Sequence, residues 1–440
     1  TVLGAALTGL WLMPWLGLAR TLALGVAINF ALALLILLRH RAWIRRATLV
    51  GAPALAIGLV LLAGAALDDH WQRTLTRGWW RGAVRFERLA DYRAASRAAE
   101  LLYHRDGASA TVTVEKWLRE GKPEISLRVN GKVDASSGGD VPTQLLSGHL
   151  PMLLHPDPQE ACVVGIGSGM TGGAILVHPG VRRLDTVEIS PEVAHVARAY
   201  FGEYNGRSLE DPRTQVVIDD AKSFLRVSGR QYDVIISEPS NPWMAGVSGV
   251  FSLEFYEQCR ASLKPGGLMT QWVQVYETSD EALKTVLATF ASVFPYFTVW
   301  QTLPGDLILI GAPEPFRWDL ATVERRFAVP AVRTGISRAD VLRLPALLAL
   351  QLVSDYNAPF LAPLETTRHS DFFPVLEYLA QRAFFVRREA TLPRVFDENL
   401  SRRPGTLLGE WLARPPLAGE DFAALALLNS EHGVPMPQVM

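Results

Sequence analysis

Four short segments hold the residues whose types and spacing could do chemistry. Gly165-Ile-Gly167-Ser-Gly169 follows one apolar run, Glu188 ends the next, Asp219-Asp220-Ala221 follow the third, and Glu238 follows the fourth. Glycines let the backbone approach a ligand closely, and an acid at the end of the next strand suits the hydroxyls of a ribose. A carboxylate after the third run could accept a hydrogen bond from an adenine amino group. The pattern predicts a nucleoside site with Glu238 beside the reacting centre.

The elements that position these residues alternate between apolar runs and helix-like stretches. The apolar runs are 161–165, 184–189, 214–218 and 232–237, and the helix-like stretches lie near 171–178, 191–201, 222–227 and 252–263. This alternation predicts an α/β fold with a parallel, doubly wound sheet, which binds ligands beyond the carboxyl ends of its strands. Later runs at 297–301 and 307–311, joined by Leu-Pro-Gly-Asp, predict an antiparallel edge.

The beginning of the chain differs from the rest. Residues 1–67 contain no Asp, Glu or Lys and only five Arg, in three apolar stretches at roughly Val2–Ala19, Leu22–Leu38 and Leu49–Leu67. Each stretch is near the minimum length that spans a hydrocarbon core of about 30 Å. We expect about three transmembrane helices in a lipid bilayer, with further spans before Thr1. Six arginines on one side against four on the other favour an integral protein of the inner or plasma membrane whose catalytic domain is cytoplasmic.

The expected plan has five parts. They are a transmembrane segment at 1–67, a membrane-proximal linker at 68–99, a small β-domain at 100–150, a doubly wound catalytic domain at 151–315 and a helical C-terminal extension at 316–440. Apolar alternation at 110–115 and 124–129, around a Gly-Lys-Pro turn, predicts a hairpin in the small domain.

Composition excludes several classes. Lys+Arg 43 against Asp+Glu 44 gives a net charge of −1, so no basic field points to nucleic acid. Two cysteines, Cys162 and Cys259, cannot form a disulfide scaffold or a Cys-x-x-Cys zinc cluster, and the nine histidines include no His-Glu-x-x-His. We therefore expect no metal.

A series of motifs runs from Glu100 to about Ala312. In chain order they are Glu100-Leu-Leu-Tyr-His-Arg, Asn130-Gly-Lys, Gln144 with His149-Leu-Pro151, the glycine turn, Glu188, Asp220-Ala221, Tyr232-Asp-Val-Ile-Ile, and Gly246 with Phe251-Ser and Glu254-Phe-Tyr256. This order and spacing resemble the polyamine aminopropyltransferases, the spermidine synthase family. In particular, the chain is similar to the subgroup in which a multi-span membrane segment precedes the synthase domain.

The resemblance implies a Rossmann-like fold that binds decarboxylated S-adenosylmethionine. It also implies transfer of an aminopropyl group to an amine or polyamine, release of methylthioadenosine, and a homodimer. By position, the nucleoside would be held by Gln144, Gly165, Gly167, Gly169, Glu188, Asp220 and Ala221, and Glu238 stands where the family has its catalytic Asp. The resemblance and the loop positions assign substrate binding to His149, Ser168, Ser240, Asn241 and Asp371. A carboxylate at 238 could hold the acceptor ammonium and take its proton.

The chain departs from the family pattern at positions that matter for charge. The acid of the glycine turn is Ser168, and the second acid of the catalytic loop is Asn241; other departures are Ala110, Thr143 and Ala245. Loss of a charge-assisted bond costs on the order of 1.5–3 kcal/mol. Intact S-adenosylmethionine, whose carboxylate an acid at 168 would repel, therefore becomes a plausible donor.

Several alternatives stay open. Asn241-Pro-Trp243 partly resembles the Asn/Asp-Pro-Pro-aromatic loop of amino-methylating enzymes, which favours a methyltransferase. Acceptor-independent cleavage of S-adenosylmethionine is a related variant, and a non-catalytic nucleoside sensor or transporter gate is a third. In the tail, Ser370-Asp371 either begins a helix as a cap or brings Asp371 into the active site.

Overall fold

The computed structural model describes residues 2–39, 58, 72–73, 76–78, 81, 86–119, 121–316, 318–355, 358, 366–391, 405–414 and 418–432. The chain divides into two compact units, Thr1–Ser136 and Ser137–Met440. The five-part domain plan, with a small β-domain that ends at residue 150, stays a prediction. The helix at Val141–Leu154, whose N-terminal part lies within the predicted small domain, belongs to the second unit.

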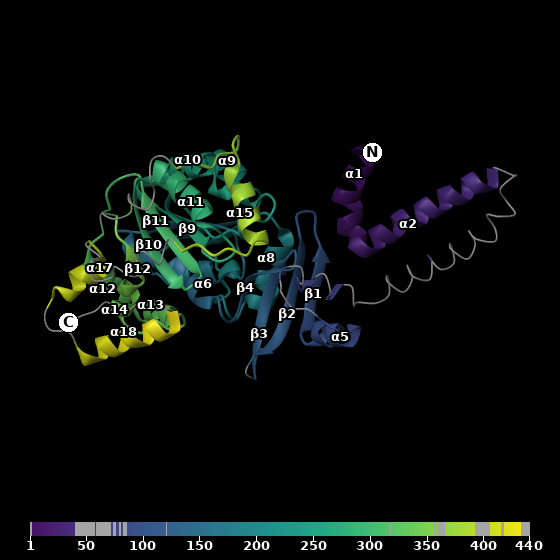
Figure 1. The fold of residues 1–440 in the computed structure, drawn as a ribbon. Coiled ribbons are helices and arrows are strands. Elements are labelled where there is room, and N and C mark those ends of the chain that lie inside the picture. The colour runs from purple at the N-terminus through teal and green to yellow at the C-terminus, as the bar shows by residue number, and fades with distance from the viewer. Residues whose placement is uncertain are drawn as a thin grey trace. The chain divides into compact units, whose positions relative to one another are not determined.

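The N-terminal helices are α1 (Val2–Leu7), the π-helical turn η1 (Thr8–Leu12) and α2 (Met13–Arg39), drawn in purple in Figure 1. Gly17 breaks them with φ 77° and ψ 168°, a backbone conformation that favours glycine. The break leaves the Leu18 N–H outside the helical ladder, and this N–H donates to Asp106 Oδ2 at 2.7 Å. Gly17 lies near the end of the first predicted span, Val2–Ala19, and the second, Leu22–Leu38, follows it within α2.

One helix in the described part of the chain, Val2–Ala33, is long and apolar enough to cross a membrane. This statement rests on length and composition alone, and an apolar helix near the N-terminus also fits other interpretations. The third predicted span, Leu49–Leu67, lies outside the described residues except for Gly58. Membrane anchoring therefore stays a prediction.

The rest of the first unit contains α5 (Leu89–Arg97) and a four-stranded antiparallel sheet. Its strands, in spatial order, are β1 (Glu100–Asp106), β2 (Thr111–Arg119), β3 (Lys122–Val129) and β4 (Lys132–Ser136). β2 and β3 pair up to Arg119 and Lys122, which confirms the predicted hairpin. Glu115 is buried in this sheet and is neutralised by Arg77 at 3.1 Å and Arg128 at 2.9 Å.

The second unit is built on an eight-stranded sheet in the order β12-β10-β11-β9-β8-β5-β6-β7. The strands are β5 (Glu160–Val164), β6 (Arg183–Glu188), β7 (Thr214–Ile218), β8 (Tyr232–Ser237), β9 (Leu263–Gln274), β10 (Tyr296–Leu303), β11 (Asp306–Ala312) and β12 (Gln351–Val353). Strands β5 to β9 are parallel, whereas β9, β11, β10 and β12 pair antiparallel. The predicted parallel, doubly wound sheet with an antiparallel edge is confirmed.

Helices cover both faces of this sheet (Figure 1). They are α6 (Val141–Leu154), α7 (Met170–Leu176), α8 (Pro191–Phe201), α9 (Ala221–Ser228), α10 (Leu253–Ala261), α11 (Asp280–Val293), α12 (Leu320–Phe327), α13 (Pro330–Ser337), α14 (Leu344–Ala349), α15 (Val375–Phe385), α17 (Leu407–Leu412) and α18 (Gly419–His432). Two 3₁₀ turns, η3 (Ser208–Glu210) and η4 (Val247–Phe251), complete the described elements.

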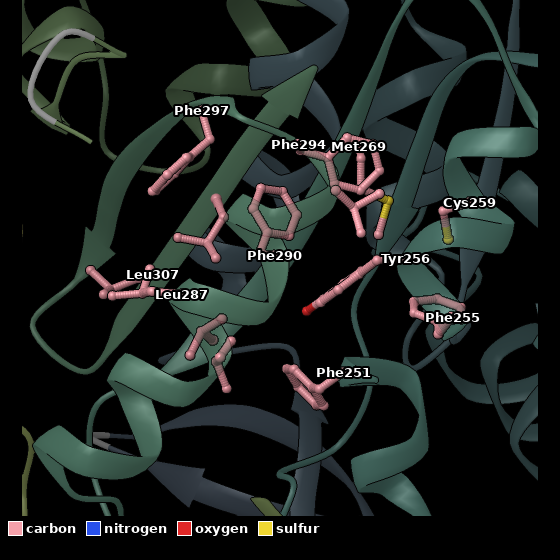
Figure 2. Packing of buried hydrophobic residues seen from close by; sticks show 14 of the residues in the cluster. Phe251, Phe255, Tyr256, Cys259, Met269, Leu287, Phe290, Phe294, Phe297 and Leu307 are labelled. Carbon is pink, nitrogen blue, oxygen red and sulfur yellow. The ribbon is translucent and has the colours of Figure 1, made fainter. Parts of the chain in front are cut away.

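The strand period of two decides which side chains meet which helices. On β5, Ala161 and Val163 join a core with α6 and α7, while Cys162 and Val164 join a larger core with α9, α10 and α11. Figure 2 shows this larger core, where Tyr256 of α10 packs near Phe290 and Phe294. Both faces are thus buried, and chemistry is confined to the edge where the strands end.

Candidate active site

The glycine turn lies at the point where the chain connections diverge from β5. From β5 the chain passes through α7 to β6 on one side, whereas β8 pairs with β5 on the other. In an open α/β sheet such a switch point forms the ligand crevice. Gly165, Gly167 and Gly169 have φ of 90°, 52° and 81°. A Cβ on Gly165 would stand 2.6 Å from the carbonyl oxygen of Glu238, so glycine is required where the turn meets the end of β8.

Glu188 ends β6 beside the glycine turn, as predicted. Its Oε2 accepts a hydrogen bond from the Ile166 N–H at 3.0 Å, and its Oε1 accepts one from the Ser190 N–H at 2.9 Å. A carboxylate oxygen has two acceptor sites, so these bonds leave capacity for the hydroxyls of a ribose. Ile189, the next residue, exposes an apolar side chain that could cover the face of a base.

Asp220 stands at the end of β7 and caps helix α9. Its Oδ2 accepts from the Ser223 N–H at 2.9 Å, while Asp219 Oδ1 accepts from the Asp220 N–H at 2.8 Å. Both acids are exposed, and Ala221 is buried. The parallel order of the strands brings these residues to the same edge of the sheet as Glu188.

Gln144 and Ser168 meet directly. Gln144 lies on α6, and its Oε1 accepts a hydrogen bond from Ser168 Oγ in the glycine turn. Ser168 Oγ also accepts from the Met170 N–H at 3.2 Å, and both side chains are buried. The hydroxyl at the position where the resemblance implies an acid thus joins α6 to the turn.

Glu238 follows β8 and is only partly exposed. Its Oε2 accepts a hydrogen bond from Thr171 Oγ1, which also lies 2.9 Å from the Gln144 carbonyl oxygen. Burial raises the pKa of Glu238 to about 8; the Thr171 hydrogen bond opposes this shift, and the negative charges of Asp140 and Asp306 add to it. A carboxyl with this pKa is a stronger base than an ordinary glutamate, and a cation bound beside it would favour its ionised form.

Sequence reasoning missed Asp306 and Asp140 as site residues. Asp306 begins β11; its Oδ2 accepts from Thr143 Oγ1 at 2.9 Å, and its Oδ1 accepts from Trp272 Nε1 at 3.1 Å. β11 runs antiparallel to β9, so its first residue lies at the edge where β9 ends. The Leu-Pro-Gly-Asp turn, combined with this strand order, was the signal that could have found Asp306.

The loop after Glu238 is held by its own packing. Ser240 Oγ lies 3.0 Å from Met244 Sδ, and Trp243 stacks on Phe384 with ring centroids 4.4 Å apart. Asn241 is completely buried, and its amide has no hydrogen-bond partner among the described residues. A buried amide in this state usually hydrogen-bonds an ordered water.

Two predicted substrate-binding residues are not brought to this cluster by any contact in the described structure. His149 is completely buried, with Nδ1 3.1 Å from His178 Nε2, and burial lowers its pKa well below the ordinary value. A Cβ on Gly335 would stand 2.5 Å from His149 Nε2, so the ring is enclosed by α13. An acceptor-binding role for His149 stays a prediction without a supporting contact.

Asp371 contacts the first turn of α9 instead. Lys222 Nζ lies 2.5 Å from Asp371 Oδ1, and the Asp371 N–H donates to Glu254 Oε2 at 2.9 Å. Ser370 Oγ accepts from the Phe373 N–H at 3.0 Å, but α15 begins without a side-chain cap. The structure therefore supports a local turn and an ion pair in place of the expected helix cap. The described residues also contain no group of three or more His, Cys, Asp or Glu side chains arranged to hold a metal ion.

Comparisons with known proteins identify similar sequences. The family model for the spermine/spermidine synthase domain matches residues 143–308. A polyamine aminopropyltransferase of Nitrosomonas europaea is 31% identical over 185 residues, which are 40% of this chain and 57% of that protein. Putrescine N-methyltransferase 2 of Nicotiana attenuata is 27% identical over 214 residues, 45% of this chain and 57% of that protein. The chain thus spans less than two thirds of the length of both relatives.

Among solved structures, spermidine synthase from Thermotoga maritima superposes with a TM-score of 0.43 at 19% identity. The superposition covers 54% of this chain and 87% of that structure.

Proposed function

Since the chain belongs to the spermine/spermidine synthase family through residues 143–308, we propose that it transfers an aminopropyl-type group from an S-adenosylmethionine-type donor to an amine. The acceptor nitrogen attacks the propyl carbon beside the sulfonium, the carbon–sulfur bond breaks, and methylthioadenosine leaves. The proton lost by the nitrogen goes to Glu238. No metal takes part in this scheme.

One observation carries the proposal. Glu238, with a pKa raised to about 8, lies at the switch point against the glycine turn that Glu188 anchors. An aliphatic amine has a pKa of about 10.4 and reacts only after it loses a proton. A base whose pKa is near the working pH is suited to accept that proton.

Asp306 and Asp140 support an amine as the acceptor. The resemblance alone suggested that two anionic groups are missing, at Ser168 and Asn241. The structure places two other acids near enough to Glu238 for their charges to raise its pKa. We propose that Asp306, held in position by Thr143 and Trp272, contributes the negative charge that attracts the acceptor.

The donor is proposed to bind along the strand ends. Gly165, Gly167 and Gly169 would approach it through the backbone, Glu188 would accept from the ribose, and Asp220 with Ala221 would bind the base. Ser168 is neutral and bonded to Gln144, so it adds no charge against the carboxylate of intact S-adenosylmethionine. Both the intact and the decarboxylated donor are therefore kept as candidates.

N-methyl transfer is a second candidate function. The similarity to putrescine N-methyltransferase 2 of Nicotiana attenuata favours it, together with neutral Ser168 and Asn241. This reaction would use intact S-adenosylmethionine and release S-adenosylhomocysteine. Acceptor-independent cleavage would release methylthioadenosine without consuming an amine, and a non-catalytic nucleoside sensor would release neither product.

The identity of the nucleoside by-product distinguishes these functions. The purified full chain is incubated with S-adenosylmethionine or its decarboxylated form, with and without putrescine, and the nucleoside products are identified by mass spectrometry. Methylthioadenosine that forms only with the amine supports aminopropyl transfer. S-adenosylhomocysteine, amine-independent methylthioadenosine, or binding without turnover would each replace the proposal by the corresponding alternative.

We also propose that the chain is anchored in a membrane, with the second unit in the cytoplasm, and that it forms a homodimer. The helix Val2–Ala33 supports the anchor, and the arginine distribution supports the orientation. A reporter fused after Met440 that is active only outside the cytoplasm would contradict the orientation. A monomer in detergent by light scattering would contradict the dimer.

A further inference from the structure

Four exposed aromatic side chains lie in the segment around α15, far from Glu238 in the sequence. Phe372, Phe373, Tyr378 and Phe385 are 85%, 73%, 70% and 78% exposed. Scattered exposed apolar residues are normal on a protein surface, but a concentration of large ones marks an interaction site. We call these four residues the aromatic patch.

Helix α15 presents half of the aromatic patch on one stripe. Tyr378, Arg382 and Phe385 follow one another at four- and three-residue spacing, which places them on the same helical face. The remaining face buries Leu376, Ala380 and Ala383 in the core beside α11. The core-facing side of α15 therefore already has its packing partner, and the exposed stripe is a separate surface of the helix.

The backbone on both sides of the aromatic patch is fixed by hydrogen bonds. After α15, the Arg387 N–H donates to the Phe384 carbonyl at 3.0 Å, and the Thr278 N–H donates to the Arg388 carbonyl at 3.1 Å. Before α15, the Asp371–Lys222 ion pair and the Ser370–Phe373 hydrogen bond hold the turn that carries the first two phenylalanines. The aromatic rings thus project from an ordered surface.

Four exposed arginines lie in the same segment as the aromatic patch. The exposed arginines of this segment are Arg368, Arg382, Arg387 and Arg388. The acids of the same segment are Glu377, Glu389 and Asp371, and Asp371 is paired with Lys222. From neighbouring helices, Glu254 accepts from the Asp371 N–H, and Asp280 accepts from the N–H and hydroxyl of Thr391. Aromatic rings flanked by arginines match the interface of a bilayer, where rings lie at the headgroup level and arginines attract anionic lipids.

We propose that the aromatic patch and its arginines dock the second unit on the anionic surface of a lipid bilayer. Charge complementarity supports this partner, and the helix Val2–Ala33 offers the same chain a means of reaching a bilayer. A second copy of the chain is a poorer occupant. A twofold contact through this patch would bring the four arginines of each copy close to one another.

A single fluorescent label tests the proposal on the full chain. Cys162 and Cys259 are completely buried, so a cysteine introduced at exposed Thr367, next to Arg368, is labelled selectively with an environment-sensitive dye. The labelled chain is reconstituted into vesicles of phosphatidylcholine alone or with phosphatidylglycerol. We expect a blue-shifted emission, quenched by nitroxide-labelled lipid, that is larger in the anionic vesicles. Leu342→Cys, also exposed, provides a label outside the patch and should keep the emission seen in detergent.

Two double variants separate the contribution of the arginines from that of the aromatic rings. Each arginine near an anionic surface strengthens binding about fivefold, so Arg382→Glu with Arg387→Glu should abolish the difference between the two vesicle types. Phe372→Ser with Phe385→Ser should abolish the nitroxide quenching. Arg198→Glu with Arg333→Glu reverses two exposed arginines of the same unit outside the patch and should change neither signal.

Three results would overturn the proposal. They are an emission in anionic vesicles equal to that in detergent, equal shifts in neutral and anionic vesicles, and a shift that disappears when the chain is diluted at constant lipid concentration. The last result would identify a second copy of the chain as the occupant. Circular dichroism and methylthioadenosine binding verify that each variant is folded.

Discussion

Thr171 Oγ1 donates a hydrogen bond to Glu238 Oε2, which connects the helix after the glycine turn to the residue after β8. The same threonine oxygen lies 2.9 Å from the Gln144 carbonyl oxygen of α6. Three elements therefore meet at the hydroxyl group of Thr171. This contact sets both the orientation and part of the proton affinity of the proposed base.

Glu238→Gln should lower kcat by a factor of about 10² to 10⁴, because the amide cannot accept the proton of the acceptor amine. Binding of methylthioadenosine, measured by calorimetry, should stay within about twofold, since the nucleoside is proposed to contact other residues. Glu257→Gln, an exposed residue of α10, is the matched control. Full activity in Glu238→Gln would remove this residue from the mechanism.

The raised pKa of Glu238 also predicts how stability depends on pH. The folded protein holds this proton up to about pH 8, whereas the unfolded chain releases it near 4.5. The stabilising contribution is therefore complete below pH 4.5 and is lost as pH rises toward 8. Glu238→Gln has no such ionisation, so its Tm relative to wild type should rise between pH 5 and pH 8. A Tm difference that is constant with pH would show that Glu238 titrates normally.

Asp306→Asn should weaken binding of the amine acceptor and leave binding of the nucleoside unchanged. Losing a charge-assisted contact costs on the order of 1.5–3 kcal/mol, so the KM for putrescine should rise by about 10- to 150-fold. Removing the negative charge should also lower the pKa of Glu238 toward its ordinary value. Asp340→Asn is the control, because asparagine tolerates its φ of 60°. An unchanged KM for putrescine would exclude Asp306 from the acceptor site.

Ser168→Asp should increase the preference for the decarboxylated donor. At about 4 Å and an effective dielectric of about 20, the repulsion between this carboxylate and that of intact S-adenosylmethionine is on the order of 4 kcal/mol before screening. Gln144 must turn its amide nitrogen toward the new acid, since its oxygen now faces Ser168. Competition binding of the two donors measures the ratio, and Ser168→Asn controls for size. If wild type and Ser168→Asp show equal ratios, position 168 does not sense the tail of the donor.

Glu188→Gln should weaken methylthioadenosine binding by roughly 1–3 kcal/mol, the cost of leaving buried hydroxyls poorly paired. It should also lower the Tm, because Glu188 holds the Ile166 and Ser190 amides. Calorimetry and thermal unfolding separate the two effects when methylthioadenosine is added at several concentrations. Affinity equal to wild type would place the ribose elsewhere.

The sequence by itself determined the strand–helix alternation, the hairpin of the first unit and the positions of Glu188 and Glu238. These features depend on local patterns, because side chains alternate along a strand and the ends of parallel strands share one edge. The glycine turn was also visible in the sequence, whereas the reason that Gly165 must be glycine, the close approach of the Glu238 backbone, comes from the tertiary structure.

Only the tertiary structure decided which other groups surround Glu238. Asp306 arrives by the antiparallel return of β11, and Thr171 and Gln144 arrive because α6 and α7 pack on one face of the sheet. Sequence spacing cannot show such contacts, since each joins residues that are distant along the chain. The same limit applies to His149, which the resemblance assigned to the acceptor site by position; only the tertiary structure shows that α6 and α13 pack together and that the ring is completely buried. It applies as well to the helix after Ser136, because what this helix packs against places it in the second unit, and its own sequence does not show this.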